Sequence, residues 1–384
     1  MADRIVLNTI SYHGHGAIEN IVPELTARGY KKAFVCSDPD LIKFGVTKKV
    51  TDLLDAANFA YAVYSEIKPN PTIANVQDGV AAFKAAEADC MVAIGGGSSM
   101  DTAKAIGIII NNPEFADVRS LEGVAPTKKH AVFTIAVPTT AGTAAEVTIN
   151  YVITDVEKKR KFVCVDTNDI PEIAVVDPDM MASMPKGLTA ATGMDALTHA
   201  LEAYVSTYAT PETDRYAEMA AKMIYEALPV VREEPKNVEM REQLLVASFL
   251  AGMAFTRTYV GYVHAFAHSI GGRYGVAHGL ANAVLLPHIM EYYLPVSTPR
   301  LARMAQICGI SSDSDESTRA RAFVESIAAM NQTGGVPERL AEFPRAEIDA
   351  VIKEAFQECH GTYPVPRYYT RPAARALLEQ VCAE

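Results

Sequence analysis

The sequence predicts an α/β N-terminal domain followed by an all-α C-terminal domain, with residues 1–184 in the first and 185–384 in the second. Two observations lead to this division. Short apolar runs rich in Val, Ile and Phe alternate with helical patterns in the first half, and the strand signals stop after Pro185. A chain of 384 residues is also long enough for two hydrophobic cores.

The predicted strands of the first domain are separated by predicted helices. We expect strands at residues 32–36, 60–64, 90–94, 132–137 and 173–176, and helices at residues 18–28, 40–55, 72–88 and 98–111. Gly29 is placed to end the first helix, and Asn70-Pro71-Thr72 to begin the third. Strands that alternate with helices form a parallel, open sheet. Residues 151–155 and 161–166 flank a polar stretch and predict a hairpin added to that sheet.

Composition excludes several kinds of partner. The net charge is −11, and no basic stripe is present that would follow a nucleic-acid backbone. No run of 18 or more apolar residues predicts a membrane span, and the N-terminus has no secretory pattern. The six cysteines are scattered without a CxxC pair, which is typical of reduced thiols in a cytoplasmic protein.

A glycine-rich loop follows the predicted strand at residues 90–94. Gly95-Gly96-Gly97-Ser98 connects this strand to a helix, so that backbone N–H groups and the helix dipole can approach a pyrophosphate. The ordinary G-x-G-x-x-G pattern is absent, because Met100 occupies the third glycine position. A glycine-rich turn without a ligand is therefore an equal alternative for this loop by itself.

Two further segments favour a dinucleotide at this sheet. The loop from Pro138 to Glu146 also follows a strand and is dense in hydroxyls and small residues, so two such loops predict a clamp. Asp38 ends the strand at residues 32–36, where a carboxylate can bind ribose hydroxyls and repel a 2′-phosphate, which favours NAD over NADP. On local grounds Asp38 is equally well placed to cap the helix that follows it.

The predicted helical domain contains a pattern typical of a metal site. Asp195 and His199 are spaced i,i+4 and so lie on one helix face. His264 and His268 form a second i,i+4 pair, and His278 follows after two glycines. A single histidine in an apolar helix is usually a core residue, but several together with a carboxylate predict one divalent ion that polarises a substrate oxygen. A site of nitrogen and oxygen ligands binds zinc more tightly than ferrous iron, so the pattern does not determine the metal.

At these residues the sequence resembles the group III, iron-containing alcohol dehydrogenases over nearly the whole chain. The resemblance rests on AIGGGSSMDTAKAIG, PTTAGTAAEVT, ATGMDALTHALEAY and GYVHAFAHSIGGRYGVAHGLANAVLLPH. It implies a dehydroquinate-synthase-like fold, a homodimer, and Fe²⁺ bound by Asp195, His199, His264 and His278. It also implies that His268 relays a proton without binding the metal. NAD is implied at Asp38, Asn70, Gly96, Gly97, Ser98, Thr139, Thr140, Thr143 and Lys161.

The expected substrate is a short alcohol or diol and its aldehyde. NNPEFADVRSLEG and TINYVITDVEKKRKFVCVD are most similar to the branch of the family that interconverts lactaldehyde and 1,2-propanediol. Dehydrogenases of 1,3-propanediol or short primary alcohols are the alternative, and a lyase on the same scaffold or a non-catalytic metal-binding protein are remote ones. Arg257, Ala277 and Val365 depart from the family pattern, and Arg257 or Arg273 is a candidate contact for the substrate.

Overall fold

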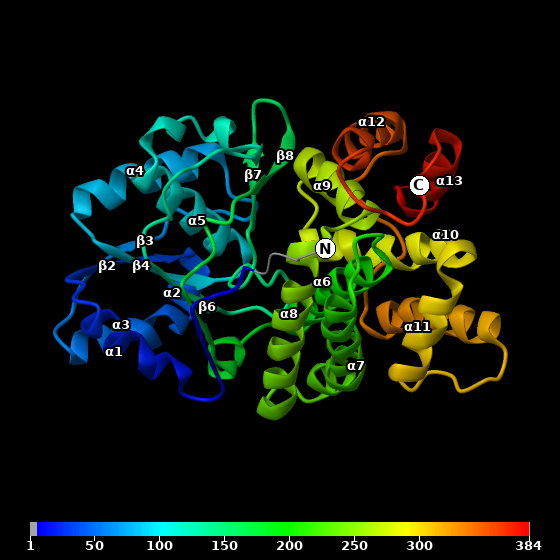
Figure 1. Cartoon of the computed structure of the whole chain (residues 1–384), viewed down its shortest axis with the longest axis horizontal. Helices are drawn as coiled ribbons and strands as arrows, with labels where there is room; N and C mark the ends of the chain where they lie inside the picture. The colour runs from blue at the N-terminus through cyan, green and yellow to red at the C-terminus, as the bar shows by residue number, and fades with distance from the viewer. Residues whose placement is uncertain (1–5, 384) are drawn as a thin grey trace. The chain divides into compact units, whose positions relative to one another are not determined.

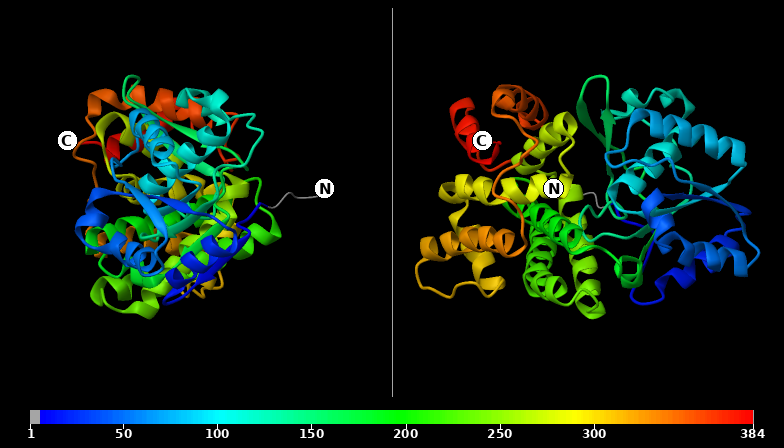
Figure 2. Two further views of the ribbon diagram at one scale, coloured as in Figure 1. Left: turned by 90° about the vertical axis from the view of Figure 1, so that its left-hand side faces the viewer. Right: turned by 180° about the vertical axis from the view of Figure 1, so that it is seen from behind.

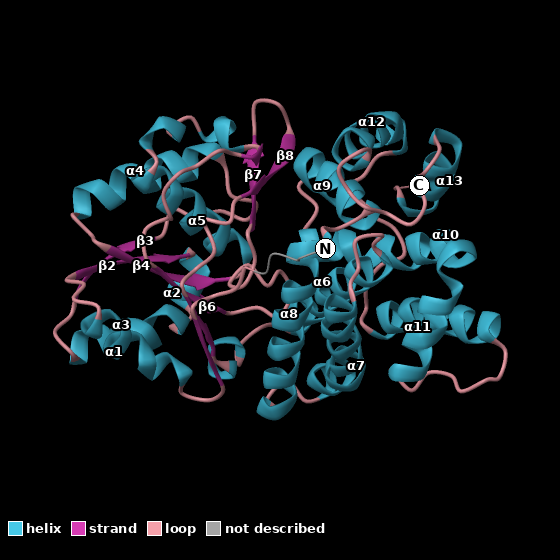
Figure 3. Cartoon of the chain, viewed as in Figure 1, coloured by secondary structure: helices cyan, strands magenta, loops and turns pink. Residues whose placement is uncertain are grey.

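The computed structural model describes residues 6–383 and divides the chain into two compact units. One unit contains the chain up to Thr140 together with Ala144–Ser183, and the other contains Ala141–Thr143 and the chain from Met184 onward. The strands lie in the first unit, and the second is helical (Figure 3). The predicted fold class, an α/β part followed by a helical part, is confirmed.

The first unit is built on a six-stranded sheet in which every neighbouring pair is parallel. The strand order is β1-β9-β6-β4-β2-β3. The predicted strands correspond to all of these except β1, which the sequence analysis missed because it is a four-residue edge strand with alternating exposure. The bounds are β1 (Ile10–His13), β2 (Lys32–Ser37), β3 (Ala60–Tyr64), β4 (Cys90–Gly95), β6 (Thr134–Pro138) and β9 (Ile173–Val176).

Helices cover both faces of this sheet (Figures 1 and 2). Along β2, Ala33 and Val35 belong to one buried cluster, whereas Phe34 and Cys36 belong to another, as the two-residue period of a strand requires. The first cluster is completed by α1 (Ile21–Ala27) and α3 (Val46–Ala56), and the second by α4 (Ile73–Ala86) and α5 (Gly97–Asn111). A strand buried on both faces needs a continuous apolar run, which is the signal that predicted it.

The turn signals act largely as expected, with one correction. Gly29 follows α1 with φ of 80°, and Thr72 caps α4 by accepting a hydrogen bond from the backbone N–H of Asn75. The single helix predicted at residues 40–55 is wrong, because the chain forms α2 (Pro39–Lys43) and then α3. Gly45 separates them with φ of 74°, a conformation that an α-helix cannot continue.

The hairpin at residues 150–165 forms as predicted, but its predicted addition to the parallel sheet is wrong. β7 (Asn150–Asp155) and β8 (Arg160–Val165) pair antiparallel, and β8 also pairs with β5 (Gly123–Val124) in a separate three-stranded sheet. Tyr151 and Phe162, from the buried face of this sheet, join the cluster that contains Ile106 of α5. Because α5 is apolar on nearly all sides, it needs this second cover opposite the parallel sheet.

The second unit consists of α6 (Lys186–Val205), α7 (Pro211–Glu233), α8 (Val238–Thr258), α9 (Tyr262–Tyr274), α10 (His278–Ile307), α11 (Glu316–Thr333), α12 (Ile348–Cys359) and α13 (Arg371–Val381). Short 3₁₀ helices occur in both units: the first contains η1 (Ala17–Asn20), η2 (Pro113–Phe115), η3 (Val118–Leu121) and η4 (Pro178–Met181), and the second contains η5 (Arg345–Glu347). Within residues 6–383 no single helix is long and apolar enough to cross a bilayer; α8 and α9 meet the combined criteria of length and composition only as a pair, and they are bent by 99° at their break.

Candidate metal centre and cofactor loops

Helix α6 carries Asp195 and His199 on one face. Both side chains are buried, and the His199 ring stacks on Phe255 with ring centroids 4.2 Å apart. His199 Nδ1 lies 3.2 Å from the carbonyl oxygen of Gly142, so Nδ1–H donates and Nε2 is left as the metal-binding nitrogen. Gly142 is required by this close approach, because a Cβ there would lie 3.2 Å from Asp195 Oδ2 and 3.0 Å from the Thr192 side chain.

His264 and His278 reach the same place from two other helices. His264 lies in the first turn of α9, and His278 is the first residue of α10. The residue after His278 must be small, because a Cβ on Gly279 would lie 2.7 Å from the backbone oxygen of Ala191 in α6. The start of α10 therefore packs directly on the helix that carries Asp195.

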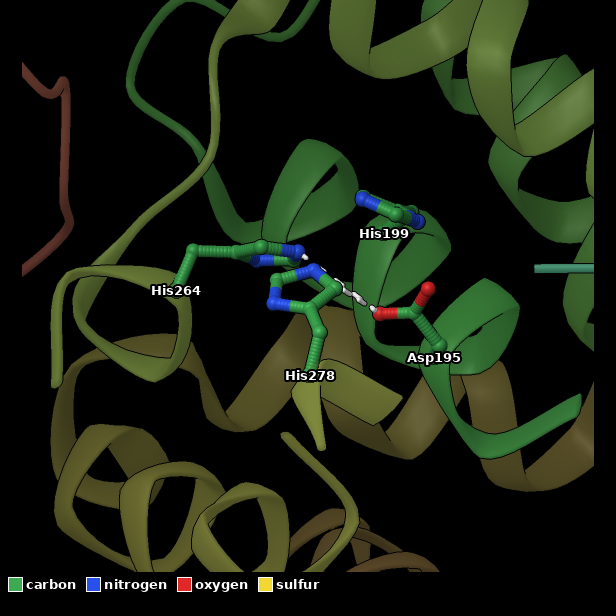
Figure 4. A group of neighbouring side chains, drawn as sticks. All are labelled: Asp195, His199, His264 and His278. Atoms are coloured by element: carbon green, nitrogen blue, oxygen red, sulfur yellow. Dashed lines mark ion pairs between the residues drawn. The ribbon is translucent and has the colours of Figure 1, made fainter. Parts of the chain in front are cut away.

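The four side chains converge on one point (Figure 4). One donor atom from each of Asp195, His199, His264 and His278 lies within 4.8 Å of all the others. Asp195 Oδ1 is 3.5 Å from His278 Nε2 and 3.9 Å from His264 Nε2. Two donors bound to one ion at about 2.1 Å in a tetrahedral site are separated by about 3.4 Å. The spacing and chemistry of this donor set thus fit a divalent ion such as Fe²⁺ or Zn²⁺.

Burial sets the protonation state that this site requires. It lowers the pKa of His199 to about 3, and it lowers the pKa of His264 well below the usual value, with the neighbouring His268 adding to the shift. Both imidazoles are therefore neutral near pH 7. A neutral imidazole offers a lone pair to a metal ion, whereas an imidazolium does not.

Glu202 supports His264 and was missed by the sequence analysis. His264 Nδ1 donates to Glu202 Oε2 at 2.6 Å, and the backbone N–H groups of Gly261 and Val263 donate to the same carboxylate at 2.8 and 2.7 Å. Burial raises the pKa of Glu202, and the backbone donors oppose that shift; because three N–H groups donate to its two oxygens, Glu202 accepts them as a carboxylate. This carboxylate holds the His264 ring so that Nε2 faces the metal. A sequence signal was present, since Glu202 is i+7 from Asp195 and i+3 from His199 on α6.

His268 lies next to the four donors without joining them. Its ring stacks on that of His278 at a centroid distance of 5.4 Å, and it lies edge-on to His264 at 5.8 Å. His268 Nδ1 donates to Glu358 Oε1 of α12 at 2.7 Å, and the hydroxyl of Tyr363 donates to the same oxygen at 2.7 Å. Glu358 was also missed, because no local pattern relates residues 90 positions apart.

The proposed cofactor loops meet at one edge of the parallel sheet. β2 lies between β3 and β4: the chain adds β3 on one side of β2 and then crosses back to add β4 on the other side, so the order of the strands reverses between β2 and β4. Ligands of open α/β sheets bind beyond the carboxyl ends of the strands at such a reversal. Ser37 pairs with Ile94, and Gly95 pairs with Pro138, so three candidate segments end side by side here: Asp38, Gly96–Ser98 and Thr139–Thr140.

The glycine loop is shaped by its contacts. Gly95 has φ of 152°, and a Cβ there would lie 2.3 Å from Ser99 Oγ. Gly96 is the N-cap of α5, and its Cβ would lie 3.1 Å from the Thr140 side chain. Gly97 and Ser98 open the helix. The backbone N–H groups at this helix start are thus left accessible to an anion.

The remaining cofactor candidates lie in three places. Asp38 caps α2, and its Oδ1 accepts a hydrogen bond from Leu41 N at 3.0 Å, so the helix-cap alternative holds in the structure. Asn70 has φ of 57° and precedes Pro71, whose carbonyl accepts from Thr154 of β7; Lys161 of β8 pairs with Thr154. Thr143 belongs to the helical unit, with Gly142.

The two arginines considered for substrate binding both contact acidic side chains. Arg273 donates from Nε to Glu354 Oε2 at 2.9 Å, and a second bond joins the same two side chains. Arg257 donates to Glu212 Oε2 at 3.2 Å. The fork of Arg273 is thus occupied by a carboxylate, which positions helices rather than a ligand. Arg257 makes a single bond to Glu212, and its Nη2 has no hydrogen-bond partner among residues 6–383.

The two units define a class of protein. Neutral imidazoles and a carboxylate around one point suit an ion that polarises an oxygen, and the sheet suits a dinucleotide that exchanges a hydride. A chain that combines the two is a metal-dependent dehydrogenase.

Comparison with known proteins makes this specific: the chain belongs to the iron-containing alcohol dehydrogenase family. The model described as iron-containing alcohol dehydrogenase matches residues 8–178, and the model of the family's C-terminal part matches residues 189–382. Lactaldehyde reductase of Escherichia coli strain K12 is 46% identical over 368 residues, which cover 95% of this chain and 96% of that protein.

Solved structures agree with this assignment. A 1,3-propanediol oxidoreductase has a TM-score of 0.94 at 35% identity, with 99% of this chain and 100% of that chain covered. A sulfoacetaldehyde reductase from Bifidobacterium kashiwanohense, solved in complex with NAD⁺, has a TM-score of 0.86 at 26% identity over 99% and 98% of the chains. These neighbours support the expected dehydroquinate-synthase-like fold.

Proposed function

We propose that this protein is an NAD(H)-dependent, iron-containing dehydrogenase that interconverts lactaldehyde and 1,2-propanediol. The observation that carries the proposal is the buried convergence of Asp195, His199, His264 and His278 in a chain that is 46% identical to a lactaldehyde reductase. The oxidoreductase of 1,3-propanediol among the structural neighbours makes 1,3-propanediol the second candidate. Short primary alcohols follow from the same site chemistry.

The proposed mechanism assigns a task to each group of residues. A bound divalent ion supplies Lewis-acid polarisation of the substrate oxygen, and bound NAD supplies the hydride acceptor. Asp195 and the three histidines hold the ion, and Glu202 fixes the tautomer of His264. Since His268 Nδ1–H is held by Glu358, its Nε2 is the atom that accepts the proton of the alcohol.

The NAD assignment rests on the edge of the sheet described above. The proposal places the pyrophosphate at Gly96, Gly97 and Ser98, at the start of α5. Thr139, Thr140 and Thr143 supply hydroxyl donors, Asp38 contacts the ribose, and Asn70 and Lys161 also line the cofactor. NAD⁺ in the related sulfoacetaldehyde reductase supports this choice of cofactor. We also propose that the protein is a homodimer and that it is located in the cytoplasm.

One preparation tests the proposed function. The protein is purified anaerobically, its metal is quantified, and kcat/KM is measured for lactaldehyde, 1,2-propanediol, 1,3-propanediol and propanol with NAD(H) and NADP(H). We expect one iron per chain, preference for NAD(H), and the highest kcat/KM with lactaldehyde. Metal binding without turnover of any of these substrates would contradict the enzymatic assignment. A higher kcat/KM with 1,3-propanediol would show that it, and not the lactaldehyde/1,2-propanediol pair, is the substrate.

Replacing Glu358 with glutamine is expected to lower kcat about 10- to 100-fold, because the charge that holds and stabilises the His268 imidazole is lost. Metal content and the KM for NAD⁺ are expected to stay the same, and the solvent deuterium isotope effect on kcat is expected to rise. Glu354→Gln is the control, since Glu354 lies one turn earlier on α12 and pairs with Arg273. Equal effects of both variants would refute this role.

Replacing Gly96 with valine is expected to weaken NADH binding at least about tenfold, because a side chain there meets Thr140 and covers the start of α5. Binding is measured by titration of NADH fluorescence. Metal content is expected to be unchanged. Gly187→Val is the matched control, because a Cβ on Gly187 meets nothing within 4 Å. Unchanged NADH affinity in Gly96→Val would remove the cofactor from this loop.

A further inference from the structure

Asn282 is a buried amide at the centre of the metal ligands. It lies on α10, one helical turn after His278, and its side chain is fully buried. Its Nδ2 atom is 2.6 Å from Asp195 Oδ1, 3.2 Å from His264 Nε2 and 3.2 Å from His278 Nε2. The amide therefore contacts three of the four proposed ligands, which come from three different helices.

These three contacts differ in strength and in their compatibility with a bound ion. An amide NH₂ has two hydrogens, so it serves at most two of the three acceptors. The contact with the carboxylate is the shortest and is charge-assisted. The lone pairs of the two imidazole nitrogens are the ones that bind a metal, whereas a carboxylate oxygen has a second lone pair. Only the bond from Asn282 to Asp195 is compatible with all four ligands binding the ion.

We infer that Asn282 is a positioning residue of the metal centre, which donates from Nδ2 to Asp195 Oδ1 and so orients that carboxylate toward the ion. Asp195 is nearly inaccessible to water, and a buried carboxylate needs hydrogen-bond donors to remain charged and in one orientation. Asn282 plays for Asp195 the part that Glu202 plays for His264. This inference rests on the metal site of the proposed function.

The oxygen of the Asn282 amide leads to an alternative role for this residue, that of a metal ligand. Asn282 Oδ1 is buried and has no hydrogen-bond partner among residues 6–383. A rotation of the amide by half a turn would place this oxygen, instead of the nitrogen, among the ligand atoms, and rotations of this kind are inexpensive. Asn282 would then be a fifth ligand, and its removal would change the coordination number.

The test measures metal binding as well as activity. Apparent affinity for Co²⁺ and Zn²⁺ is measured by competition with a chromophoric chelator, on the full-length protein and on Asn282→Ala. Asn282→Leu, which retains the side-chain volume, serves if the alanine variant does not fold. The matched control is Asn331→Ala, because Asn331 is also buried and donates one bond to the Ala283 carbonyl at 2.5 Å, and its Oδ1 has no hydrogen-bond partner in the described part of the chain.

We expect affinity to fall about 10- to 100-fold in the Asn282 variants, with one ion per chain at saturation and an unchanged visible spectrum of bound Co²⁺. Asn331→Ala is expected to keep the affinity of the unmodified protein. Equal affinity in the Asn282 variants and in the control would overturn the inference. A more intense Co²⁺ spectrum, indicating fewer ligands, would overturn it in favour of Oδ1 as a ligand. Failure of the unmodified protein to bind either ion would instead refute the proposed function.

Discussion

His199→Ala is expected to lose the bound metal and to lower kcat/KM at least about 1,000-fold, which corresponds to about 4 kcal/mol of transition-state stabilisation. His199 is buried, and its Nδ1 is held by the carbonyl of Gly142, so Nε2 is the nitrogen that it offers to the ion. Three ligands would remain, and three ligands hold a divalent ion much less tightly than four. Metal content and turnover of lactaldehyde with NADH are the two measurements.

The control for this variant is another histidine of the same helical unit. His288 lies on α10, ten residues after His278, and burial lowers its pKa, but it lies outside the cluster of four donors. We expect His288→Ala to keep its metal and to stay within about threefold of the unmodified kcat/KM. Full activity of His199→Ala with a normal metal content would exclude His199 as a ligand.

Glu202→Ala is expected to reduce both stability and metal affinity. Removing the carboxylate leaves the backbone N–H groups of Gly261 and Val263 and the His264 ring without their acceptor in a buried place. Each unsatisfied buried donor costs about 1–3 kcal/mol, so we expect the free energy of unfolding to fall by about 3–5 kcal/mol. Metal affinity is expected to fall about 10- to 100-fold, because His264 is no longer held. Denaturant unfolding and chelator competition measure the two effects.

Glu172→Ala is the control that distinguishes the loss of stability from the loss of metal affinity. Glu172 lies in the α/β unit, where its carboxylate accepts a backbone N–H from Thr134 at 3.0 Å. Its removal is expected to lower stability but to leave metal affinity unchanged. If Glu202→Ala bound metal as tightly as Glu172→Ala does, the support of His264 by Glu202 would be unimportant for the site.

Several features of the fold could be predicted because their signals are local. The strands β2, β4 and β9 are continuous apolar runs, since both of their faces are buried, and Thr72 and Gly29 mark helix ends through their own backbone chemistry. The placement of the β7–β8 hairpin was not predictable in this way. Its alternating pattern shows that one face is buried, but not that α5 is what covers it.

Of the two i,i+4 pairs in the sequence, only Asp195 and His199 both belong to the proposed metal site. Asp195 and His199 share a helix face, and both reach the cluster. His264 and His268 share a face equally well, yet only His264 offers an atom to the cluster, while His268 turns its Nδ1 to Glu358. Helical spacing brings two side chains to the same side, but the neighbouring helices determine what each one contacts.

By itself, the sequence determined the two-part architecture and the residues that can bind a metal, because apolar periodicity and the spacing of side chains on a helix are properties of a local segment. Only the tertiary structure decided how those residues act: Gly142, Glu202 and Glu358 hold Nδ1 of His199, His264 and His268 and so turn Nε2 of each toward the site, and Asn282 contacts the carboxylate. These partners lie 57 to 90 residues from the groups they hold, and only packing between elements brings such distant positions within hydrogen-bond distance.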